Sequence, residues 1–189
     1  MTAVIIESWN VQGLDWSIAA SRNPRRLHFA QAVGNDDKDM ERAARLGRCE
    51  RGSGHDCYLK GIDVRVNMYT TQNIHRQMLR YSFLDIVSSM SLENSWRGIV
   101  LSDFHMQNVD PFIVDYLRSK QIICDNRDFF LHNMPMGVLL GISFKCSYLQ
   151  LKTIHAQRRT HRNPGWQIIC DWIEELPMFK ELVLDKEKG

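Results

Sequence analysis

The chain has 189 residues, of which 44% are hydrophobic and 24% charged, and its formal net charge at pH 7 is +2. This length is enough for a buried core, so we expect residues 1–189 to form a single domain. The small net charge argues against bulk nucleic-acid binding. No apolar run approaches the roughly 20 residues of a membrane span, and the N-terminus lacks the basic and apolar regions of a signal peptide.

The cysteines exclude two further classes of protein. Their number, 5, is odd, and no two of them form a CxxC pair. This pattern argues against a disulfide framework and against a zinc site, and it favours a reducing cytoplasm as the location. The five residues are Cys49, Cys57, Cys124, Cys146 and Cys170.

The N-terminal half alternates between predicted strands and helices. Gly61–Tyr69 alternates apolar with polar residues and predicts a half-buried strand. The following helix is expected to begin at Thr70 or Thr71 as its N-cap, and the hydroxyl-rich segment Ser88–Ser91 ends it. The expected elements are a strand at Ala3–Trp9, helices at Leu14–Ser21 and Asp37–Arg48, a break at Arg51–His55, the strand at Gly61–Tyr69 and a helix at Thr70–Val87.

The C-terminal half is predicted to be mostly helical. Met134–Phe144 is apolar, and its periodicity leaves both helix and strand open. The helix that follows the Asn163-Pro164-Gly165 break has a predicted core face of Trp166, Ile169, Trp172 and Ile173. The expected helices are Pro111–Ser119, started by Asp110-Pro111, then Tyr148–Arg162 and Trp166–Leu176, before a polar, frayed tail at Asp185–Gly189.

Two segments suggest an anion site. On a helix over Tyr148–Arg162, Lys152, His155, Arg159 and Arg162 fall on one stripe, and such groups repel each other unless an anion is nearby. A solvated basic face is the simpler interpretation of this stretch alone. Ser88–Ser91 is likewise either an ordinary turn or a set of donors for a phosphate or carbonyl oxygen.

Three separated stretches together resemble the flavin-dependent thymidylate synthases. Gly54-His55 follows a helix and precedes a strand, as that family's Gly-His pair does. Gln77–Ser82 (QMLRYS) stands where the family has Gln-x-x-Arg-His-Arg, at the same distance from the histidine. Leu149–Trp166 resembles the family's Asn-Leu-Arg helix, with Arg159 in register, and Met134-Pro135-Met136 resembles the Leu-Pro-Leu before it. The resemblance covers residues 37 to 175.

The sequence departs from the family pattern at several positions. Arg-His-Arg becomes Arg80-Tyr81-Ser82, which removes two of its three imidazole or cationic groups. The family's serine ten residues after the arginine is replaced by Met90, although Ser89 and Ser91 flank it. Asn-x-Arg becomes Tyr148-x-Gln150.

The resemblance implies an α+β fold, a mainly antiparallel sheet with long helices packed on it. It also implies FAD-dependent C5 methylation of a uracil nucleotide, dUMP or UMP, with NADPH and methylene-tetrahydrofolate as co-substrates, in a homo-oligomer, which in this family is a tetramer. The residues that it assigns are His55, Arg80, Tyr81, Ser82, Ser88, Tyr148 and Gln150 to the flavin, Gln77, Arg80, Ser89, Ser91 and Arg159 to the substrate, and Ser89 and Ser91 to catalysis.

Each assignment has a simpler alternative. Arg80 would pair with Asp85 or Glu93, His55 would be an exposed loop residue, and Tyr81 and Tyr148 would be packing residues. Two alternative functions also stay open. The chain would carry out another C5 modification of a pyrimidine, or it would be a non-catalytic nucleotide- or nucleic-acid-binding module that kept the fold.

Overall fold

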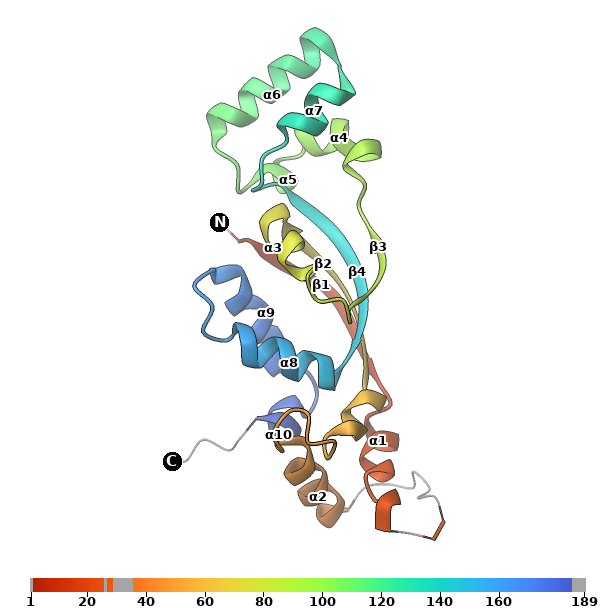
Figure 1. Cartoon of the computed structure of the whole chain (residues 1–189). Coiled ribbons are helices and arrows are strands. Elements are labelled where there is room, and N and C mark those ends of the chain that lie inside the picture. The colour runs from red at the N-terminus through yellow and green to blue at the C-terminus, as the bar shows by residue number, and fades with distance from the viewer. Residues whose placement is uncertain (1, 26, 29–35, 185–189) are drawn as a thin grey trace. The chain divides into compact units, whose positions relative to one another are not determined.

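The structure is a computed structural model that describes residues 2–25, 27–28 and 36–184 (Figure 1). The chain forms two compact units. Unit 1 comprises Met1–Ser8 and Val66–Phe144, and unit 2 comprises Trp9–Arg65 and Lys145–Gly189. The single domain expected from the sequence stays a prediction. In the part of the chain that is described, no helix is long and apolar enough to cross a membrane, and all five cysteines are free.

A four-stranded sheet of order β1-β2-β4-β3 is the common element. Its strands are β1 (Val4–Gln12), β2 (Asp63–Thr71), β3 (Asp85–Ser89) and β4 (Leu139–Ser147). The end of β2 pairs with the start of β1, because Thr71 N–H donates to the Ala3 carbonyl at 2.9 Å, so these strands are antiparallel. In β2, Val64, Val66 and Met68 are buried while Arg65 and Asn67 are exposed, which confirms the predicted half-buried strand.

The helices divide between the units. Unit 1 contains α3 (Gln72–Met78), α4 (Leu92–Leu101), α5 (Asp103–Met106), α6 (Pro111–Cys124) and α7 (Arg127–Asn133). Unit 2 contains α1 (Leu14–Ala20), α2 (Asp37–Gly47), α8 (Tyr148–Arg158), α9 (Pro164–Glu175), α10 (Phe179–Val183) and the 3-10 turns Asn23–Arg25 and Cys57–Gly61. The α+β fold class, the first strand and the helices expected at Leu14, Asp37, Pro111 and Trp166 are confirmed. The predicted tail at Asp185–Gly189 lies outside the described residues.

The helix expected over Thr70–Val87 is wrong beyond its second turn. Thr71 is the N-cap, as predicted, but α3 ends at Met78. Residues 79–84 form turns that bury Tyr81 and Leu84 without a helix. Asp85–Ser89 is strand β3, and just beyond it Met90 N–H donates to the Gly141 carbonyl at 2.8 Å. Pairing with β4 thus overrides the local helical pattern.

Met134–Phe144, which periodicity left open, is largely strand. Residues 139–147 form β4, which lies between β2 and β3 in the sheet. Val138, Leu139, Leu140, Ile142 and Phe144 are all buried. Gly141, Ser143 and Lys145, which alternate with them, are only partly buried, so β4 is a half-buried strand. The unbroken apolar residues at its start, Val138–Leu140, obscured this alternation in the sequence.

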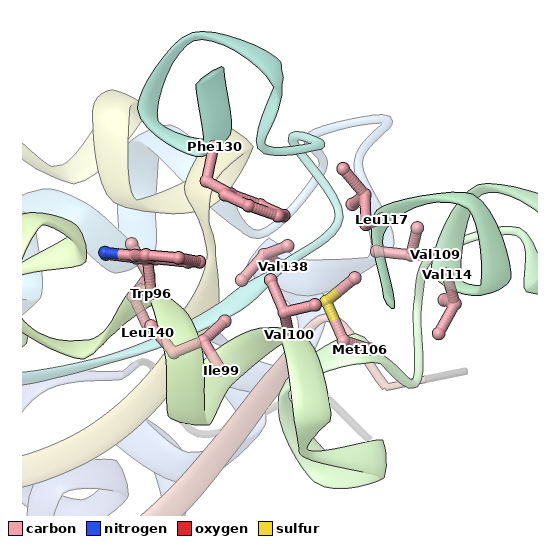
Figure 2. Close-up of a cluster of buried hydrophobic side chains, with 10 residues drawn as sticks. All are labelled: Trp96, Ile99, Val100, Met106, Val109, Val114, Leu117, Phe130, Val138 and Leu140. Carbon is pink, nitrogen blue, oxygen red and sulfur yellow. The ribbon is translucent and has the colours of Figure 1, made fainter. Parts of the chain in front are cut away.

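Unit 1 has a hydrophobic cluster of its own beside the sheet (Figure 2). The rings of Trp96 from α4 and Phe130 from α7 stack with centroids 4.4 Å apart. Val138 and Leu140 reach this cluster from the start of β4. The four helices α4–α7 therefore fold onto the strand end rather than standing alone.

Ile99→Ala is expected to lower the free energy of unfolding by about 2–5 kcal/mol, because Ile99 is 1% exposed in this cluster and its removal leaves a cavity. Ile122→Ala is the matched control: Ile122 is 87% exposed, so its effect should stay within about 0.5 kcal/mol. Urea unfolding of both variants is the measurement. Equal losses would contradict the position of the cluster.

Candidate functional site

A pocket of about 440 Å³ opens on the sheet of unit 1. Two of the predicted site residues, Ser88 and Ser89, lie in its wall on the edge strand β3. All four strands contribute to it, and its lining residues are Glu7, Asn67, Met68, Tyr69, Ser88, Ser89, Met90, Gly141, Ile142 and Ser143. Pockets of this size are typical of small-molecule sites.

The polar residues that β2 and β4 contribute to this pocket, Asn67 and Ser143, were not identified from the sequence. Ser143 Oγ donates to Asn67 Oδ1 at 2.6 Å, and Asn67 Nδ2 donates to Ser8 Oγ at 3.0 Å. These bonds fix the orientation of the Asn67 amide. The sequence did show that Asn67 lies on the polar face of β2. A position on a polar face does not distinguish a residue of a binding site from one that only contacts water.

The lining of this pocket contains one carboxylate, Glu7, and neither lysine nor arginine. Its apolar part comes from Met68, Tyr69, Met90 and Ile142, and its polar part from hydroxyls and an amide. Such a surface suits an uncharged ring with a polar edge better than a phosphate, which needs cationic donors.

Arg80 is the cation that the sequence analysis grouped with these serines. It lies in the turn after α3, where its N–H donates to the Gln77 carbonyl at 3.3 Å. Its side chain is exposed, and within the described residues it has no ion-pair partner. One of its expected partners, Glu93, instead pairs with Arg127 at 3.0 Å. The guanidinium is therefore available to an external anion.

The residues around Arg80 have different environments. Tyr81 is 8% exposed, with its ring 5.3 Å from that of Phe83, as the packing alternative predicted. Ser82 is exposed, and Gln77 Nε2 donates to Asn73 Oδ1 at 3.2 Å. Ser91 is the N-cap of α4, but its hydroxyl makes no capping hydrogen bond.

In unit 2, His55 lies in an exposed loop whose glycines, Gly52 and Gly54, have φ of 89° and 79°. The loop is anchored next to His55. Lys152 Nζ donates to the Gly47 carbonyl at 2.8 Å, to the Cys49 carbonyl at 2.7 Å and to Asp56 Oδ2 at 2.7 Å. Asp56 is 2% exposed, so this is a buried, fully hydrogen-bonded ion pair.

The cationic stripe of α8 is neutralised within unit 2. His155 Nε2 lies 2.8 Å from Glu174 Oε1, and Arg159 pairs with Asp171 and, at 3.3 Å, with Glu174. Lys152, His155 and Arg159 each pair with a carboxylate of this unit, so an external anion would have to compete with these partners, and anion binding at Arg159 stays a prediction. The helix also ends at Arg158 rather than Arg162, and Arg159 is its C-cap.

Glu174 is the centre of this network. Burial alone would raise its pKa, but the hydrogen bond from His155 and the charge of Arg159 more than offset that effect, so the pKa is held below its usual value of 4.5. Lys180 Nζ lies 3.5 Å from its other oxygen. The network joins α8, α9 and α10 through a single carboxylate.

Tyr148 and Gln150 were expected at the flavin, and the structure gives both of them other contacts. Tyr148 is 0% exposed, donates its hydroxyl to the Pro177 carbonyl at 2.7 Å and lies edge-on to Phe179. Burial raises the pKa of its phenol, which stays neutral. Gln150 Oε1 accepts from Ser147 N–H at 2.6 Å and completes a capping box at the start of α8. Tyr148 is therefore a packing residue, and Gln150 caps a helix.

Lys152→Met is expected to lower the free energy of unfolding by about 3–5 kcal/mol, because it leaves Asp56 buried without its partner. Lys145→Met is the control: Lys145 pairs with Asp63 at 3.4 Å, but both side chains are exposed by 40% and 38%, so about 0–1 kcal/mol is expected. Chemical denaturation measures both. Adding Asp56→Asn to Lys152→Met should restore part of the loss, and no restoration would refute the pairing.

Glu174→Gln should lower the stability of unit 2 at neutral pH and have little effect in acid. Because the folded pKa of Glu174 is lowered, its contribution to stability is present above pH 4.5 and is lost as the pH falls through the folded value. The difference in unfolding free energy between wild type and variant should therefore shrink as the pH is lowered from 7 towards the folded pKa. Glu175→Gln, on the same helix but exposed, should show no such trend. A constant difference for Glu174→Gln would contradict the network.

Comparison with known proteins relates the whole chain to one fold. No protein-family model matches the sequence, and no curated protein matches it. A crystal structure of the flavin-dependent thymidylate synthase ThyX from Helicobacter pylori, complexed with FAD and dUMP, is 15% identical, with a TM-score of 0.71 over 98% of each chain. A second structure of ThyX from that organism, with FAD and dUMP, is 14% identical, with a TM-score of 0.71 over 96% of this chain and 97% of that one.

A third similar structure is that of a different protein. It is a UMP/dUMP methylase, PolB, from Streptomyces cacaoi, bound with 5-Br dUMP. It is 10% identical, with a TM-score of 0.65 over 96% of this chain and 92% of that one. At such identities the likeness concerns the backbone, and it agrees with the order and spacing of motifs in the sequence. The chain therefore has the fold of the flavin-dependent thymidylate synthases.

Proposed function

We propose that this protein binds FAD and a uracil nucleotide, dUMP or UMP, and methylates the pyrimidine at C5. The observation that carries the proposal is the shared fold over 98% of both chains with an enzyme complexed with FAD and dUMP. The pocket beside Ser88 and Ser89 supports it, because its lining suits a planar ring with polar edges. The co-substrates would be methylene-tetrahydrofolate and NADPH, and the working form would be a homo-oligomer in the cytoplasm, in the resembling family a tetramer.

Different residues of unit 1 would contact the phosphate groups and the rings of these ligands. The exposed guanidinium of Arg80, which has no acidic partner in the described part of the chain, would hold a phosphate of the flavin or the nucleotide. Gln77 and Ser82, in and just after α3, would add polar contacts. Ser88, Ser89 and Ser91 would donate hydroxyl hydrogen bonds to carbonyl oxygens of a ring, since none of the three is buried. Bound FAD would supply the hydride chemistry.

The protein's own contribution would be orientation and charge. A hydroxyl of Ser89 or Ser91 next to a pyrimidine carbonyl would stabilise negative charge as it develops on that oxygen. The pocket's apolar residues, such as Met68 and Met90, would keep water from the ring. His55, on its exposed loop in unit 2, stays a proposed flavin contact.

Arg159, unlike Arg80, already has acidic partners among the described residues. Its guanidinium already pairs with Asp171 and Glu174, so a nucleotide phosphate would have to replace those carboxylates. We therefore place the first phosphate contact at Arg80 and keep Arg159 as a second one that exchanges partners on binding. The mutual repulsion expected within the cationic stripe does not apply to Arg159, because its charge is paired with these carboxylates.

A non-catalytic nucleotide-binding module is the second candidate. It is favoured by the observation that Tyr148, Gln150 and Arg159, three positions assigned to ligands, have partners within unit 2. Under that alternative the protein would bind a uracil nucleotide without taking up flavin. Flavin absorbance of the purified protein, before and after incubation with FAD, separates the two candidates.

Arg80→Ala is expected to weaken binding of FAD or nucleotide by about ten- to a hundredfold, because a hydrogen bond to a charged group contributes about 1.5–3 kcal/mol. Arg76→Ala is the matched control, since Arg76 is an exposed arginine one turn earlier in α3. Calorimetric titration with FAD, dUMP and UMP is the measurement, and Arg159→Ala is titrated alongside. If Arg80→Ala binds all three like wild type while Arg159→Ala does not, the phosphate site lies at Arg159. A wild type that binds no FAD refutes the flavin enzyme.

A further inference from the structure

Unit 2 contains a large pocket that the proposed function does not use. It lies between α2 and the C-terminal helices α9 and α10, and α2 packs against α10 (Figure 1). Its volume is about 1110 Å³, which is roomy even among small-molecule sites, whose volumes are typically about 300–1,000 Å³. On α2 the lining residues stand at positions 40, 41, 44, 45 and 48, so one face of the helix forms this wall.

The apolar part of this pocket is aliphatic. It consists of four partly buried side chains, and none of the described lining residues is aromatic. The four are Met40, Ala44, Met178 and Leu184. Methionine is flexible and adapts to the shape of an apolar partner. Flat ring systems such as nucleobases are commonly bound by stacking on aromatic side chains, so this surface suits an alkyl chain better than a base or a flavin.

Two charged side chains, Glu174 and Arg48, belong to the partly buried part of the lining. The carboxylate of Glu174 is already shared by His155, Arg159 and, at 3.5 Å, Lys180. Arg48, by contrast, forms no ion pair among the described residues, and its Nε is buried there without an acceptor. A guanidinium stays charged at every physiological pH. The inner part of the pocket therefore carries a positive charge that no carboxylate compensates.

The Arg48 guanidinium is held in place before any ligand arrives. Its Nη2 donates to the Glu181 carbonyl at 2.7 Å. The backbone on either side of Arg48 is fixed by Lys152, whose ammonium binds the Gly47 and Cys49 carbonyls. A cation positioned in this way loses little conformational freedom on binding, and the remaining donors of its planar fork suit an oxyanion.

The rim of the pocket carries both signs of charge. Arg45 and Lys180 are exposed there, and so are Glu41 and Glu181. Two cations and two carboxylates balance each other, so the sign of the ligand's head group is decided by Arg48 further in. Arg45 lies one turn before Arg48 on α2 and forms no ion pair within the described part of the chain, so it can add a second contact to the same anion.

We propose that this pocket of unit 2 binds an aliphatic anion, with a carboxylate or phosphate head at Arg48 and an alkyl chain along the four apolar side chains. A fatty acid and an alkyl phosphate share this chemistry. The ligand belongs to a different class from the ring expected beside Ser88 and Ser89, and its binding does not depend on the proposed methylation.

The first test is calorimetric titration of the full-length protein with decanoate and with decyl phosphate. At least one of them should bind, and the one that binds more tightly identifies the head group. Butanoate, whose chain is about six CH₂ groups shorter, should bind at least tenfold more weakly than decanoate, because it buries less apolar surface. Decyltrimethylammonium has the same chain and the opposite charge, and it should also bind at least tenfold more weakly.

The second test uses variants and the tighter of the two decyl probes. Arg48→Met should weaken binding by about ten- to a hundredfold, because it removes hydrogen bonds to a charged head group. Arg51→Met is the matched control. Arg51 is an exposed arginine that follows α2 and is not part of the lining, so this variant should bind like wild type although its net charge changes equally.

Ala44→Leu tests the apolar part without changing any charge. Leucine suits a helix and fills part of the pocket, so the variant should fold, as circular dichroism would show, and bind the decyl probe at least tenfold more weakly. It decides the matter if Arg48→Met does not fold. The proposal is overturned by a wild type that binds neither decyl probe, by unchanged affinity in Arg48→Met or Ala44→Leu, or by AMP binding through Arg48 as tightly as the decyl probes.

Discussion

One buried ammonium group, Lys152 Nζ, determines much of how unit 2 is built. It bonds two backbone carbonyls at the end of α2, those of Gly47 and Cys49, and the carboxylate of Asp56. A buried charge is tolerated only when it is paired and its hydrogen-bonding capacity is filled. All three acceptors are therefore held at one point of α8. The loop between them, residues 50–55, is left exposed, so His55 is presented on a loop with anchored ends.

The same requirement decides which cations of the chain are available to a ligand. His155 and Arg159 share Glu174, and Arg159 also has Asp171. These groups stabilise the packing of α8 on α9, and a phosphate would have to compete with carboxylates that are already in place. Arg80 has no such competitor among the described residues. Whether a cationic side chain is available to an external anion thus depends on the carboxylates that surround it in the fold.

The edge strand β3 connects the fold to the candidate site. Because Asp85–Ser89 pairs with β4 rather than extending α3, Ser88 and Ser89 become part of the wall of a pocket instead of lying on the outside of a helix. The start of strand β4, in turn, packs into the cluster around Trp96 and Phe130 through Leu140. The helices α4–α7 therefore support the sheet edge on which the pocket depends.

The sequence by itself determined the elements whose signals are local. The alternation in β2, the acidic-to-basic order of α2 and the apolar face of α9 all depend on residues a few positions apart, and each was predicted correctly. The order and spacing of short motifs also indicated the fold. The tertiary structure alone decided which charged groups pair with one another and which strands are neighbours. Lys152 and Asp56 are 96 residues apart, and His155 and Glu174 are 19 apart. The local sequence pattern therefore showed a stripe of cations, three of which the fold pairs with carboxylates. Strand β3 was missed for the same reason, because its hydrogen bonds are made to β4, which lies more than 50 residues further along the chain.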